Sequence, residues 1–463
     1  MNGQFIRLTL ALFLFLSVVV SCKKTENDII MAPSINCTST SLSTTSFTNS
    51  GSPQNTTLSV GLNNATAGSV TFNLVSSDFT PTTYTTTVKD GQTSVAIPLT
   101  FDGTATITSE TITVSAPSYA LGSCAIATTI TEGSSTTTTT PDCSTATTTT
   151  EKVVCAANAF LATLTDAQKT AVVLSYNQTN AIKWSNLPCG SGCRLGLQLS
   201  TLTDVQLTAA LAVVKAATGT TENEGYDEAM QIRAADDVLK TAGGGTGYSS
   251  GIYFIAFLGT PSTTTTWQFQ FGGHHLAINK TYNAGAVQGA TPQFEGVEPK
   301  SWTATNGSSY APLSSEHDAM AAMLASLSAD QLASAKLSST FSDVLLGPTN
   351  DGKFPATKVG LKVSSLSTDQ QALILAAMKP WVLDTDDATA ASLLATYQNE
   401  LADTYIAYSG NASLSSNADY VRIDGPSVWI EFVCQSGVVY QNQIHYHSIW
   451  RDHTRDYGGN FTF

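Results

Sequence analysis

The hydrophobic pattern of this chain changes its period at a threonine-rich tract. Between residues 34 and 133, branched and aromatic residues alternate with polar ones, as in Val70-Thr71-Phe72-Asn73-Leu74 and Thr111-Ile112-Thr113-Val114. Gly, Asn, Asp and Pro turn signals interrupt the alternation about every dozen residues. This pattern is typical of a small antiparallel sandwich, so we expect an immunoglobulin-like module over residues 34–133.

The tract itself predicts a linker. Eleven of the twenty residues from Thr131 to Thr150 are threonine. A segment of this composition has little apolar surface to bury, so we expect an extended linker over residues 134–154. A second and larger domain then runs from residue 155 to residue 463.

Four segments after the linker share one helix-start signal. Each has Thr or Ser, then Gln three positions later, with a Leu directly before, and they begin at Leu164, Leu202, Leu327 and Leu366. This combination is a capping box with a hydrophobic staple, and it predicts an amphipathic helix in each case. The spacings of 38 and 39 residues within the two pairs suit an internal duplication and, equally, four independent uses of a common signal.

The rest of the larger domain reads as a mixture of helices and strands. Further helices are indicated around residues 228–240 and 388–408. Strand-like runs lie between and after the helices, at residues 251–258, 267–279, 427–434 and 438–450. Helices grouped around a few hairpins predict an α+β fold. The chain is therefore expected to be multidomain, with an N-terminal all-β immunoglobulin-like sandwich and a larger α+β domain.

The first 21 residues have the layout of a secretory signal. Arg7 is their one charged side chain, and a mainly apolar run follows it. Val19-Val20-Ser21-Cys22 resembles the lipobox of bacterial lipoproteins, in which the cysteine becomes N-terminal and carries the lipid. We therefore expect a signal peptide over residues 1–21, a lipidated Cys22 and a tether over residues 22–33. The lipid would hold the protein in the bacterial cell envelope, at the outer membrane.

Charge excludes one class of partner. A formal net charge of -14 leaves no basic face that could neutralise phosphates, so we do not expect nucleic acid as a partner. Only 12% of the residues are charged, and hydroxyl-bearing and small residues take the place of the missing charged ones. Such a composition is common in exported proteins.

Seven cysteines remain after Cys22, so at least one has no disulfide partner. Cys37 and Cys124 bracket the β-rich region and are expected to pair. A close-set group admits three pairings that the sequence leaves open, and its members are Cys143, Cys155, Cys189 and Cys193. The Gly-Ser-Gly between the last two suits a structural disulfide better than a metal or redox pair in an oxidising compartment. Cys434 lies in an apolar run and is expected as a buried free thiol.

The histidines direct the search for chemistry to the larger domain. All six lie in the last 190 residues, at His274, His275, His317, His445, His447 and His453. Imidazole is a common neutral metal ligand and the commonest acid–base group near neutral pH. Clustering of this residue type therefore marks the region where a functional site is expected.

His274 and His275 follow a pair of glycines. On a regular strand the two imidazoles would point to opposite faces, so only one would serve a given pocket. A bulge at the glycines would re-aim them. Glu295 and Glu298 follow on an expected loop and supply two carboxylates.

His445 and His447 are two residues apart on an expected strand, so they share a face and suit one metal ion or one anion. Arg451 has the same parity. A three-residue hairpin loop at residues 435–437 would put Glu431 on that face too. Because His-x-His alone is a weak pattern, hydrogen-bonded histidines without a ligand are the alternative. Of the other two histidines, His317 is expected in a solvated first helical turn, and His453 fits either setting.

Three blocks together resemble a known bacterial family. They are residues 267–279 with the double His, residues 294–299, and residues 445–452 followed by Asp456-Tyr457-Gly458-Gly459. In combination they are similar to the DUF3500 family of domains of unknown function, over roughly residues 155–463. Residues 294–299 stand where the family typically has a Leu-Gly-Ala-Glu-Pro block. Glu298 matches the glutamate of that block, whereas the difference at the other positions weakens any role for Glu295. The resemblance implies an exported or envelope protein, often a lipoprotein, and implies no activity.

The leading hypothesis is a metal centre in the larger domain. His445 and His447 would be ligands, joined by His274 or His275 and by Glu298. Three imidazoles around zinc would lower the pKa of a bound water and support hydrolysis, whereas copper or iron would support redox chemistry. Arg451 would orient an anionic substrate group, and the candidate catalytic residues are Arg451, Asp452 and Glu298.

Two other hypotheses stay open. In the first, the protein is a non-enzymatic surface lipoprotein that binds carbohydrate or peptide, and the sandwich is a spacer. In the second, it is a metal-free acid/base enzyme, which would contain a histidine with a perturbed pKa in a closed pocket. The sequence does not choose among the three.

Overall fold

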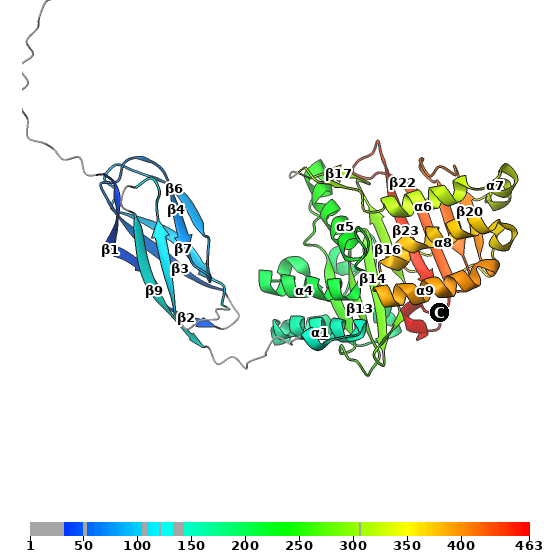
Figure 1. The fold of residues 1–463 in the computed structure, drawn as a ribbon, viewed down its shortest axis with the longest axis horizontal. Helices are drawn as coiled ribbons and strands as arrows, with labels where there is room; N and C mark the ends of the chain where they lie inside the picture. The colour runs from blue at the N-terminus through cyan, green and yellow to red at the C-terminus, as the bar shows by residue number, and fades with distance from the viewer. Residues whose placement is uncertain (1–31, 50–52, 104–108, 120–121, 133–142, 305–306) are drawn as a thin grey trace, which may run out of the picture. The chain divides into compact units, whose positions relative to one another are not determined.

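The chain divides into two compact units, and the boundary in the sequence falls between Thr137 and Thr138 (Figure 1). The computed structural model describes residues 32–49, 53–103, 109–119, 122–132, 143–304 and 307–463. The expected signal peptide and Cys22 lie outside the described residues, as do residues 134–142 of the expected linker. In the described part of the chain, no helix combines the length and the apolar character that a membrane crossing needs.

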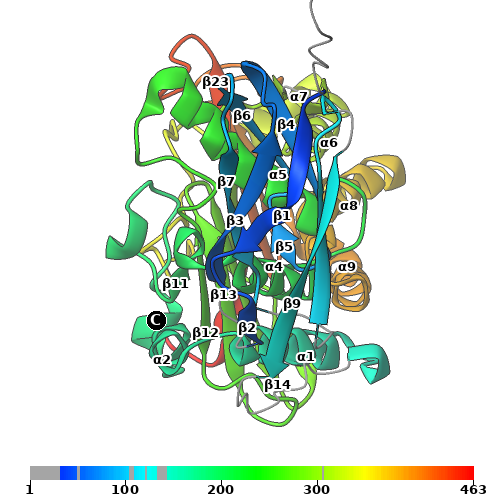
Figure 2. The same ribbon diagram turned by 90° about the vertical axis from the view of Figure 1, so that its left-hand side faces the viewer.

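The N-terminal unit is rich in strands, which form two sheets (Figure 2). One sheet has the order β1-β3-β7-β5 and the other has the order β2-β9-β8-β4-β6. The strands are β1 (Ser34–Leu42), β2 (Ser46–Asn49), β3 (Gln54–Asn63), β4 (Gly68–Val75), β5 (Phe79–Thr80), β6 (Thr83–Val88), β7 (Ser94–Phe101), β8 (Ser109–Ser115) and β9 (Ser123–Glu132).

The alternation in the sequence appears in this unit as alternate burial. In β7, for example, Val95, Ile97 and Leu99 are buried in the core, while the residues next to them are more exposed. The predicted disulfide is confirmed, because Cys37 on β1 is bonded to Cys124 on β9. The region expected to be all-β is therefore strand-rich, with one hydrophobic core.

The C-terminal unit is α+β, as predicted, and is built on one sheet of twelve strands. Its helices are α1 (Thr149–Ala162), α2 (Asp166–Val172), α3 (Gln178–Ala181), α4 (Asp204–Ala217), α5 (Tyr226–Leu239), α6 (Ser314–Ala325), α7 (Ala329–Ala335), α8 (Thr368–Leu383) and α9 (Asp387–Glu400). The main path of the sheet runs β10-β12-β13-β14-β16-β23-β22-β21-β20-β19, with β11 beside β12 and β15 beside β14.

These strands are short at the edges and long in the middle of the sheet. They are β10 (Val173–Leu174), β11 (Leu197–Gln198), β12 (Phe254–Leu258), β13 (Trp267–Gly273), β14 (Leu276–Asn283), β15 (Ala286–Gly289), β16 (Gln293–Val297), β19 (Leu361–Lys362), β20 (Tyr405–Ser409), β21 (Tyr420–Asp424), β22 (Val428–Ser436) and β23 (Ile444–Asp452). A separate hairpin pairs β17 (Trp302–Thr303) with β18 (Ser309–Tyr310).

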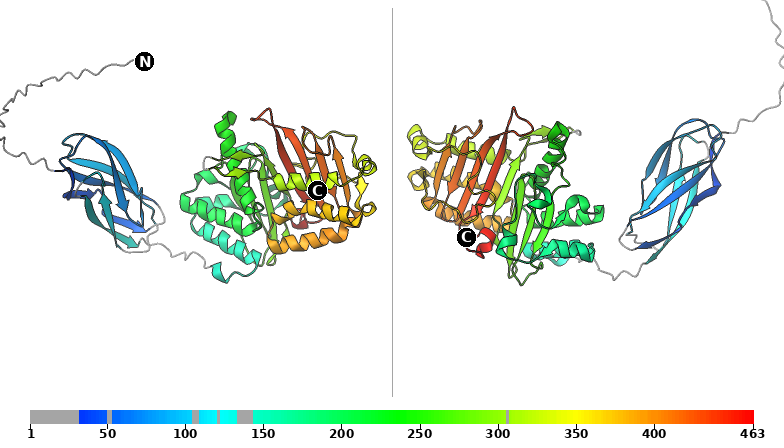
Figure 3. Two further views of the ribbon diagram at one scale, coloured as in Figure 1. Left: turned by 45° about the horizontal axis from the view of Figure 1, so that its top comes forward. Right: turned by 180° about the vertical axis from the view of Figure 1, so that it is seen from behind.

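The two faces of the large sheet have different covers. The helices α1, α4 and α5 lie over one half of a face, and α6, α8 and α9 lie over the other half (Figure 1). The right-hand view of Figure 3 shows the opposite face, where the strands lie in front of these helices. Tyr446 and Trp450 of β23 join the core on the helix side, whereas Ile449 and Phe294 join a second core with residues from loops.

The two halves of the sheet repeat one arrangement, which favours internal duplication over independent use of the helix signal. All four predicted capping boxes form, before α2, α4, α7 and α8. Gln168 and Gln206 exchange amide hydrogen bonds of 3.2 and 3.1 Å, and Gln331 and Gln370 exchange bonds of 3.3 and 2.8 Å. Each half then continues through four strands, β12-β13-β14-β16 or β20-β21-β22-β23, and the halves join where β16 pairs with β23.

Several element boundaries differ from the prediction. The first helix of the C-terminal unit, α1, begins at Thr149, inside the segment expected to be linker, and Thr150 is buried. The helix expected up to residue 408 ends at Glu400, and Tyr405–Ser409 is strand β20. The close-set cysteines pair as Cys143–Cys155 and Cys189–Cys193, and Cys434 is a buried free thiol, as expected.

Candidate functional site

His274 and His275 form the two-residue turn between β13 and β14. Gly273 and Leu276 are paired across the two strands, so the histidines lie at the tip of the hairpin rather than on a strand. The regular strand on which the two imidazoles would point to opposite faces therefore ends before them, and a turn instead of a bulge sets their directions. His275 has a φ of 63°, in the left-handed region that non-glycine residues rarely occupy, and its ring stacks on the His274 ring with 3.6 Å between centroids. Such backbone strain persists where surrounding contacts enforce it.

The backbone of this turn is held by contacts on both sides. Arg194 donates to the carbonyl oxygen of Gly273, and the hydroxyl of Tyr253 donates to the carbonyl oxygen of His274 over 2.7 Å. The N–H of His275 donates to the carbonyl oxygen of Asn186 over 3.0 Å. These bonds satisfy buried backbone groups and fix the direction of the His275 imidazole.

His445 and His447 lie on β23 and share the loop-covered face, as their spacing predicts. Their hairpin is longer than expected: Ser436 pairs with Ile444, so residues 437–443 form the connection instead of residues 435–437. As a result, Glu431 lies opposite Ile449. Its carboxylate accepts hydrogen bonds from the backbone N–H groups of Leu345 and Leu346 and from other buried donors, away from the histidines.

Three imidazoles meet between the β13–β14 turn and β23. The Nε2 atom of His447 lies 3.1 Å from Nε2 of His275 and 3.2 Å from Nε2 of His445. One ring nitrogen from each of the three lies within 4.8 Å of those of the other two. All three residues are buried, with exposures of 4% for His275, 1% for His445 and 6% for His447. We call these three residues the His cluster.

Hydrogen bonding between imidazoles does not account for the His cluster. A ring nitrogen carries either one hydrogen or one lone pair in the ring plane, so Nε2 of His447 has one direction for a hydrogen bond. Nevertheless, two nitrogens, Nε2 of His275 and Nε2 of His445, lie at hydrogen-bond distance from it. A cation at the centre would give all three nitrogens a partner at once.

Gly296 on β16 makes room for the His cluster. It pairs with His447 across the β16–β23 ladder. A Cβ atom at this position would lie 3.0 Å from Cδ2 of His447, 3.2 Å from Cδ2 of His275 and 2.9 Å from the carbonyl oxygen of Tyr446. Any larger residue would therefore have to displace the imidazoles or the strand.

Asp343 orients His447 from outside the cluster. Its Oδ1 lies 3.0 Å from Nδ1 of His447. Burial works to raise the pKa of Asp343, but hydrogen bonds from His447 and from the N–H of Val344 outweigh it and hold the pKa below its ordinary value. An ionised carboxylate here keeps the proton on Nδ1 and leaves the Nε2 lone pair of His447 directed into the cluster.

His274 pairs with a buried carboxylate next to the His cluster. Its Nδ1 lies 2.7 Å from Oδ1 of Asp236, which projects from the buried side of α5. Burial, followed by electrostatic interactions with His447, Arg194 and His445, lowers the pKa of His274 well below its ordinary value. Burial also raises the pKa of Asp236 to about 8. The imidazole of His274 and the carboxyl group of Asp236 can therefore hold a proton, or pass it between them, while neither carries a charge exposed to solvent.

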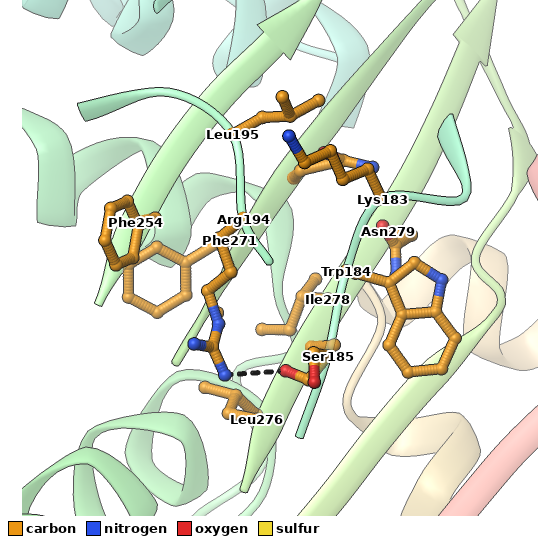
Figure 4. A pocket seen from close by; sticks show the side chains of 13 residues that line it. Lys183, Trp184, Ser185, Arg194, Leu195, Phe254, Phe271, Leu276, Ile278 and Asn279 are labelled. Atoms are coloured by element: carbon orange, nitrogen blue, oxygen red, sulfur yellow. Dashed lines mark hydrogen bonds between the residues drawn. The ribbon is translucent and has the colours of Figure 1, made fainter. Parts of the chain in front are cut away.

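A small cavity lies beside the turn, between the loop at residues 183–195 and strands β13 and β14 (Figure 4). Arg194 reaches through it toward Ser185, whose carbonyl oxygen accepts a hydrogen bond of 2.7 Å. The volume is about 20 Å³, which holds one water molecule. This cavity is therefore too small for a substrate, and Asp343, whose side chain is 49% exposed, is the partner of the cluster that reaches solvent.

Arg451 and Asp452 are engaged in contacts of their own. The guanidinium of Arg451 is fully buried, lies 3.0 Å from both Asp351 and Asp456, and stacks over Trp184. Asp452 has the opposite parity and accepts hydrogen bonds from the turn that follows β23, including one from Arg455 of 2.9 Å. The structure therefore brings neither residue into the His cluster.

Glu298 lies in a loop, as expected, whereas Glu295 lies on a strand. Residues 293–297 form strand β16. Glu298, just after it, accepts hydrogen bonds of 2.8 and 2.7 Å from the N–H groups of Val439 and Tyr440 and so fastens the β22–β23 connection. Glu295 points to the helix side of the sheet, away from the histidines.

The remaining two histidines lie outside the cluster. His317 is in the first turn of α6, as expected, but it is partly buried and stacks on Tyr446 with 5.3 Å between centroids. His453 lies 3.1 Å from Oδ1 of Asp424 and packs on Phe354.

Sequence reasoning missed Asp236, Asp343, Gly296 and Arg194. A signal existed for Asp236, because Glu228 and Asp236 fall on the same helical stripe of α5 as Ile232 and Leu239, where apolar residues are expected. Acidic residues on a buried stripe need partners, which marks them as candidates. Asp343 lies in the long connection between α7 and β19, and its local sequence gives no such signal.

Comparison with known proteins adds one finding. A family model described as "Protein of unknown function (DUF3500)" matches residues 146–459. This confirms the resemblance carried by the double-His and His-x-His blocks, and it begins at residue 146 rather than near residue 155. No curated protein and no solved structure matches the chain.

Proposed function

Starting from a chain that belongs to the DUF3500 family, we propose that its C-terminal domain binds one transition-metal ion through His275, His445 and His447 and uses it for hydrolytic or redox chemistry. The observation that carries the proposal is the convergence of three buried Nε2 atoms. For metal–nitrogen bonds of about 2.0–2.1 Å in tetrahedral geometry, two ligand nitrogens lie roughly 3.3 Å apart. The separations of 3.1 and 3.2 Å in the His cluster agree with this value.

The donor set selects the class of metal. Neutral imidazoles suit zinc, copper and iron, whereas magnesium and calcium prefer oxygen. Burial lowers the pKa of His275 well below its ordinary value and that of His445 to about 3, so both are neutral donors at neutral pH. When bound, zinc supplies Lewis acidity for hydrolysis, and copper or iron supplies electron transfer.

The residues around the cluster support chemistry there rather than a closed structural site. Three protein ligands leave a coordination position open, which is the pattern of catalytic zinc sites. Asp343 holds the Nδ1 proton of His447, and the His274–Asp236 pair keeps a second proton close to the cluster. This pair is the candidate general acid or base, in place of Arg451, Asp452 and Glu298.

We also propose a location for this chemistry. The signal-like residues 1–21 and the lipobox ending at Cys22 support export and lipid anchoring in the bacterial cell envelope, at the outer membrane. The two-sheet N-terminal unit would be an immunoglobulin-like sandwich that acts as a spacer between the anchor and the larger domain. The three disulfides are consistent with an oxidising compartment.

The test is the metal content of the full chain, purified without chelators, measured by elemental mass spectrometry. We expect about one equivalent of zinc, copper or iron, and its loss in His275→Ala, His445→Ala and His447→Ala. His453→Ala is the matched control, because this histidine also contacts a carboxylate but lies outside the cluster.

Two results would overturn the proposal. One is a folded wild-type chain that takes up none of these metals, even after incubation with each. The other is equal metal loss in His453→Ala and in the three ligand variants. The first result would favour a non-enzymatic lipoprotein that binds carbohydrate or peptide, and the second would remove the assignment of the three histidines as ligands.

A further inference from the structure

Four carboxylates converge on the helix side of the sheet, behind the His cluster. They come from α5, β16, α6 and the end of α8, and they are Glu228, Glu295, Glu316 and Asp384. One oxygen from each lies within 4.8 Å of the others, and every one of these residues is buried. Because Glu295 and Gly296 are consecutive on β16, the four carboxylates and the His cluster lie on opposite faces of the same strand. We call this group the carboxylate cage.

The hydrogen bonds of the cage are incomplete. Neither carboxylate oxygen of Glu228 has a hydrogen-bond partner among the described residues, and the same holds for Oε2 of Glu295 and Oε1 of Glu316. Glu228 is fully buried and aimed at the other three carboxylates. An uncompensated buried carboxylate costs several kcal/mol, so these oxygens require a positive partner or protons.

Two members of the cage are already oriented. Asp384 accepts hydrogen bonds from the N–H of Gly225 over 2.6 Å and from Nε2 of Gln293 over 3.0 Å. The same Gln293 nitrogen donates to Oε1 of Glu295 over 2.6 Å. These bonds hold the two carboxylates in place and leave their remaining oxygen lone pairs free for another ligand.

Lys280 does not neutralise the cage. The buried amine of Lys280 donates to the backbone carbonyl of Asp384 over 3.4 Å, and burial lowers its pKa to about 8. One lysine at that distance cannot balance four carboxylates. Burial and repulsion from neighbouring carboxylates raise the pKa of Glu228 and Glu316 well above the ordinary value. Both lie in first helical turns, of α5 and α6, where the helix dipole opposes this rise, and a bound cation would oppose it further.

A groove lies next to the cage, and Glu224 in its lining interacts electrostatically with Asp384 and Glu228. Its volume is about 440 Å³, and its lining includes Glu222, Glu224, Ser315 and Asp318. Glu224 is buried at the inner side, with one oxygen that lacks a hydrogen-bond partner among the described residues. An acidic groove beside an acidic cage attracts cations and raises their concentration close to the cage.

We propose that the carboxylate cage binds a hard divalent cation, of the class of Ca²⁺, Mg²⁺ and Mn²⁺, at a site separate from the His cluster. Glu228, Glu295, Glu316 and Asp384 supply an all-oxygen donor set, which these ions prefer and which softer metals do not. Glu224 receives the cation at the inner end of the groove. The cation ties α5, α6 and α8 to β16 and so stabilises the helix layer.

The test is calorimetric titration of the EDTA-treated, dialysed full chain with CaCl₂, MgCl₂ and MnCl₂, together with the melting temperature in each salt. We expect saturable binding of at least one ion and a higher melting temperature. Glu228→Gln and Glu316→Gln keep the side-chain shape and remove one charge each. In both variants, affinity should fall at least tenfold, while the melting temperature in EDTA rises because repulsion in the cage is relieved.

Two controls separate the outcomes. Glu222→Gln, at the exposed rim of the groove, should bind within about twofold of wild type. His447→Ala should retain binding of the hard cation, which distinguishes failure of this site from failure of the His cluster. The inference is overturned if the folded chain binds none of the three ions, or if Glu228→Gln and Glu316→Gln bind them as tightly as wild type does.

Discussion

Gly296 and His447 are direct partners on β16 and β23, and a methyl group at position 296 would lie 3.0 Å from Cδ2 of the His447 imidazole. We therefore predict that Gly296→Ala displaces the imidazoles and lowers metal affinity at least tenfold. Overpacking of this kind also costs about 1–3 kcal/mol of stability. Metal titration and denaturant unfolding of the same preparation measure both effects.

Gly192→Ala provides the control for that substitution, because a Cβ atom there meets nothing within 4 Å and the backbone is not in the left-handed region. It should leave metal affinity unchanged. Unchanged affinity in Gly296→Ala as well would contradict a metal site built on the present imidazole positions.

Substitution of Asp343 should weaken metal binding and leave the stability of the fold unchanged. Its side chain is 49% exposed, and its contact with the cluster is through Nδ1 of His447. Asp343→Asn removes the charge that holds that proton, and substitutions of such outer partners weaken metal binding by about 10- to 100-fold. We expect this loss with little change in unfolding free energy. Asp403→Asn is the control. This aspartate is also exposed, but it pairs with Lys362 and not with a residue of the His cluster.

Strand periodicity explains how much of the candidate site the sequence could predict. His445 and His447 share a face because side chains alternate along a strand with period two. The capping boxes are equally local signals, and all four form. Each of these predictions needs only the residues within one element.

The third ligand needed information from outside its element. His275 reaches the cluster because residues 274 and 275 form a turn with a φ of 63°, and that turn is held by Arg194, Tyr253 and Asn186 from other segments. Alternation along a strand predicts opposite faces for the two histidines and cannot detect these contacts.

The carboxylate cage was missed for a similar reason. Its four members come from four elements with irregular spacing, and none forms a motif by itself. Glu316 lies on the buried side of α6 beside Met320 and Met323. A carboxylate within an apolar helical stripe was therefore the one sign in the sequence that Glu316 needs a partner. Only the tertiary fold shows that several such carboxylates meet.

Arg451 is predicted to act on stability rather than on metal binding. Its guanidinium is fully buried between Asp351 and Asp456 and donates to the carbonyl oxygen of Leu346 over 2.7 Å. Arg451→Met would leave two buried carboxylates without their cation, and breaking a buried ion pair in this way costs about 3–5 kcal/mol. Denaturant unfolding measures the loss. Metal content per folded molecule should stay unchanged, and a selective loss of metal or activity at full stability would restore Arg451 as a residue of the site.

Cys434 gives a prediction that depends on pH. Burial, with a smaller contribution from the charge of Asp419, raises the pKa of its thiol to about 12, and its Sγ donates to the carbonyl oxygen of Leu414 over 3.1 Å. Deprotonation is what makes a thiol reactive, so the reactive fraction at pH 8 is about one in ten thousand. Iodoacetamide should therefore leave Cys434 of the folded chain unmodified at pH 8. The labelling rate should rise about tenfold for each pH unit above this, as long as the fold persists.

Denaturation without reduction separates the effect of the fold from the chemistry of the thiol. Unfolding returns the pKa of Cys434 to its ordinary value near 9.0, so labelling at pH 8 should become fast. The six cysteines of the three disulfides should remain unlabelled until a reductant is added. Mass spectrometry of the peptides locates each label. Rapid labelling of Cys434 in the folded chain at pH 8 would contradict its burial, and a label on Cys189 or Cys193 before reduction would contradict the disulfide in the segment that positions Arg194.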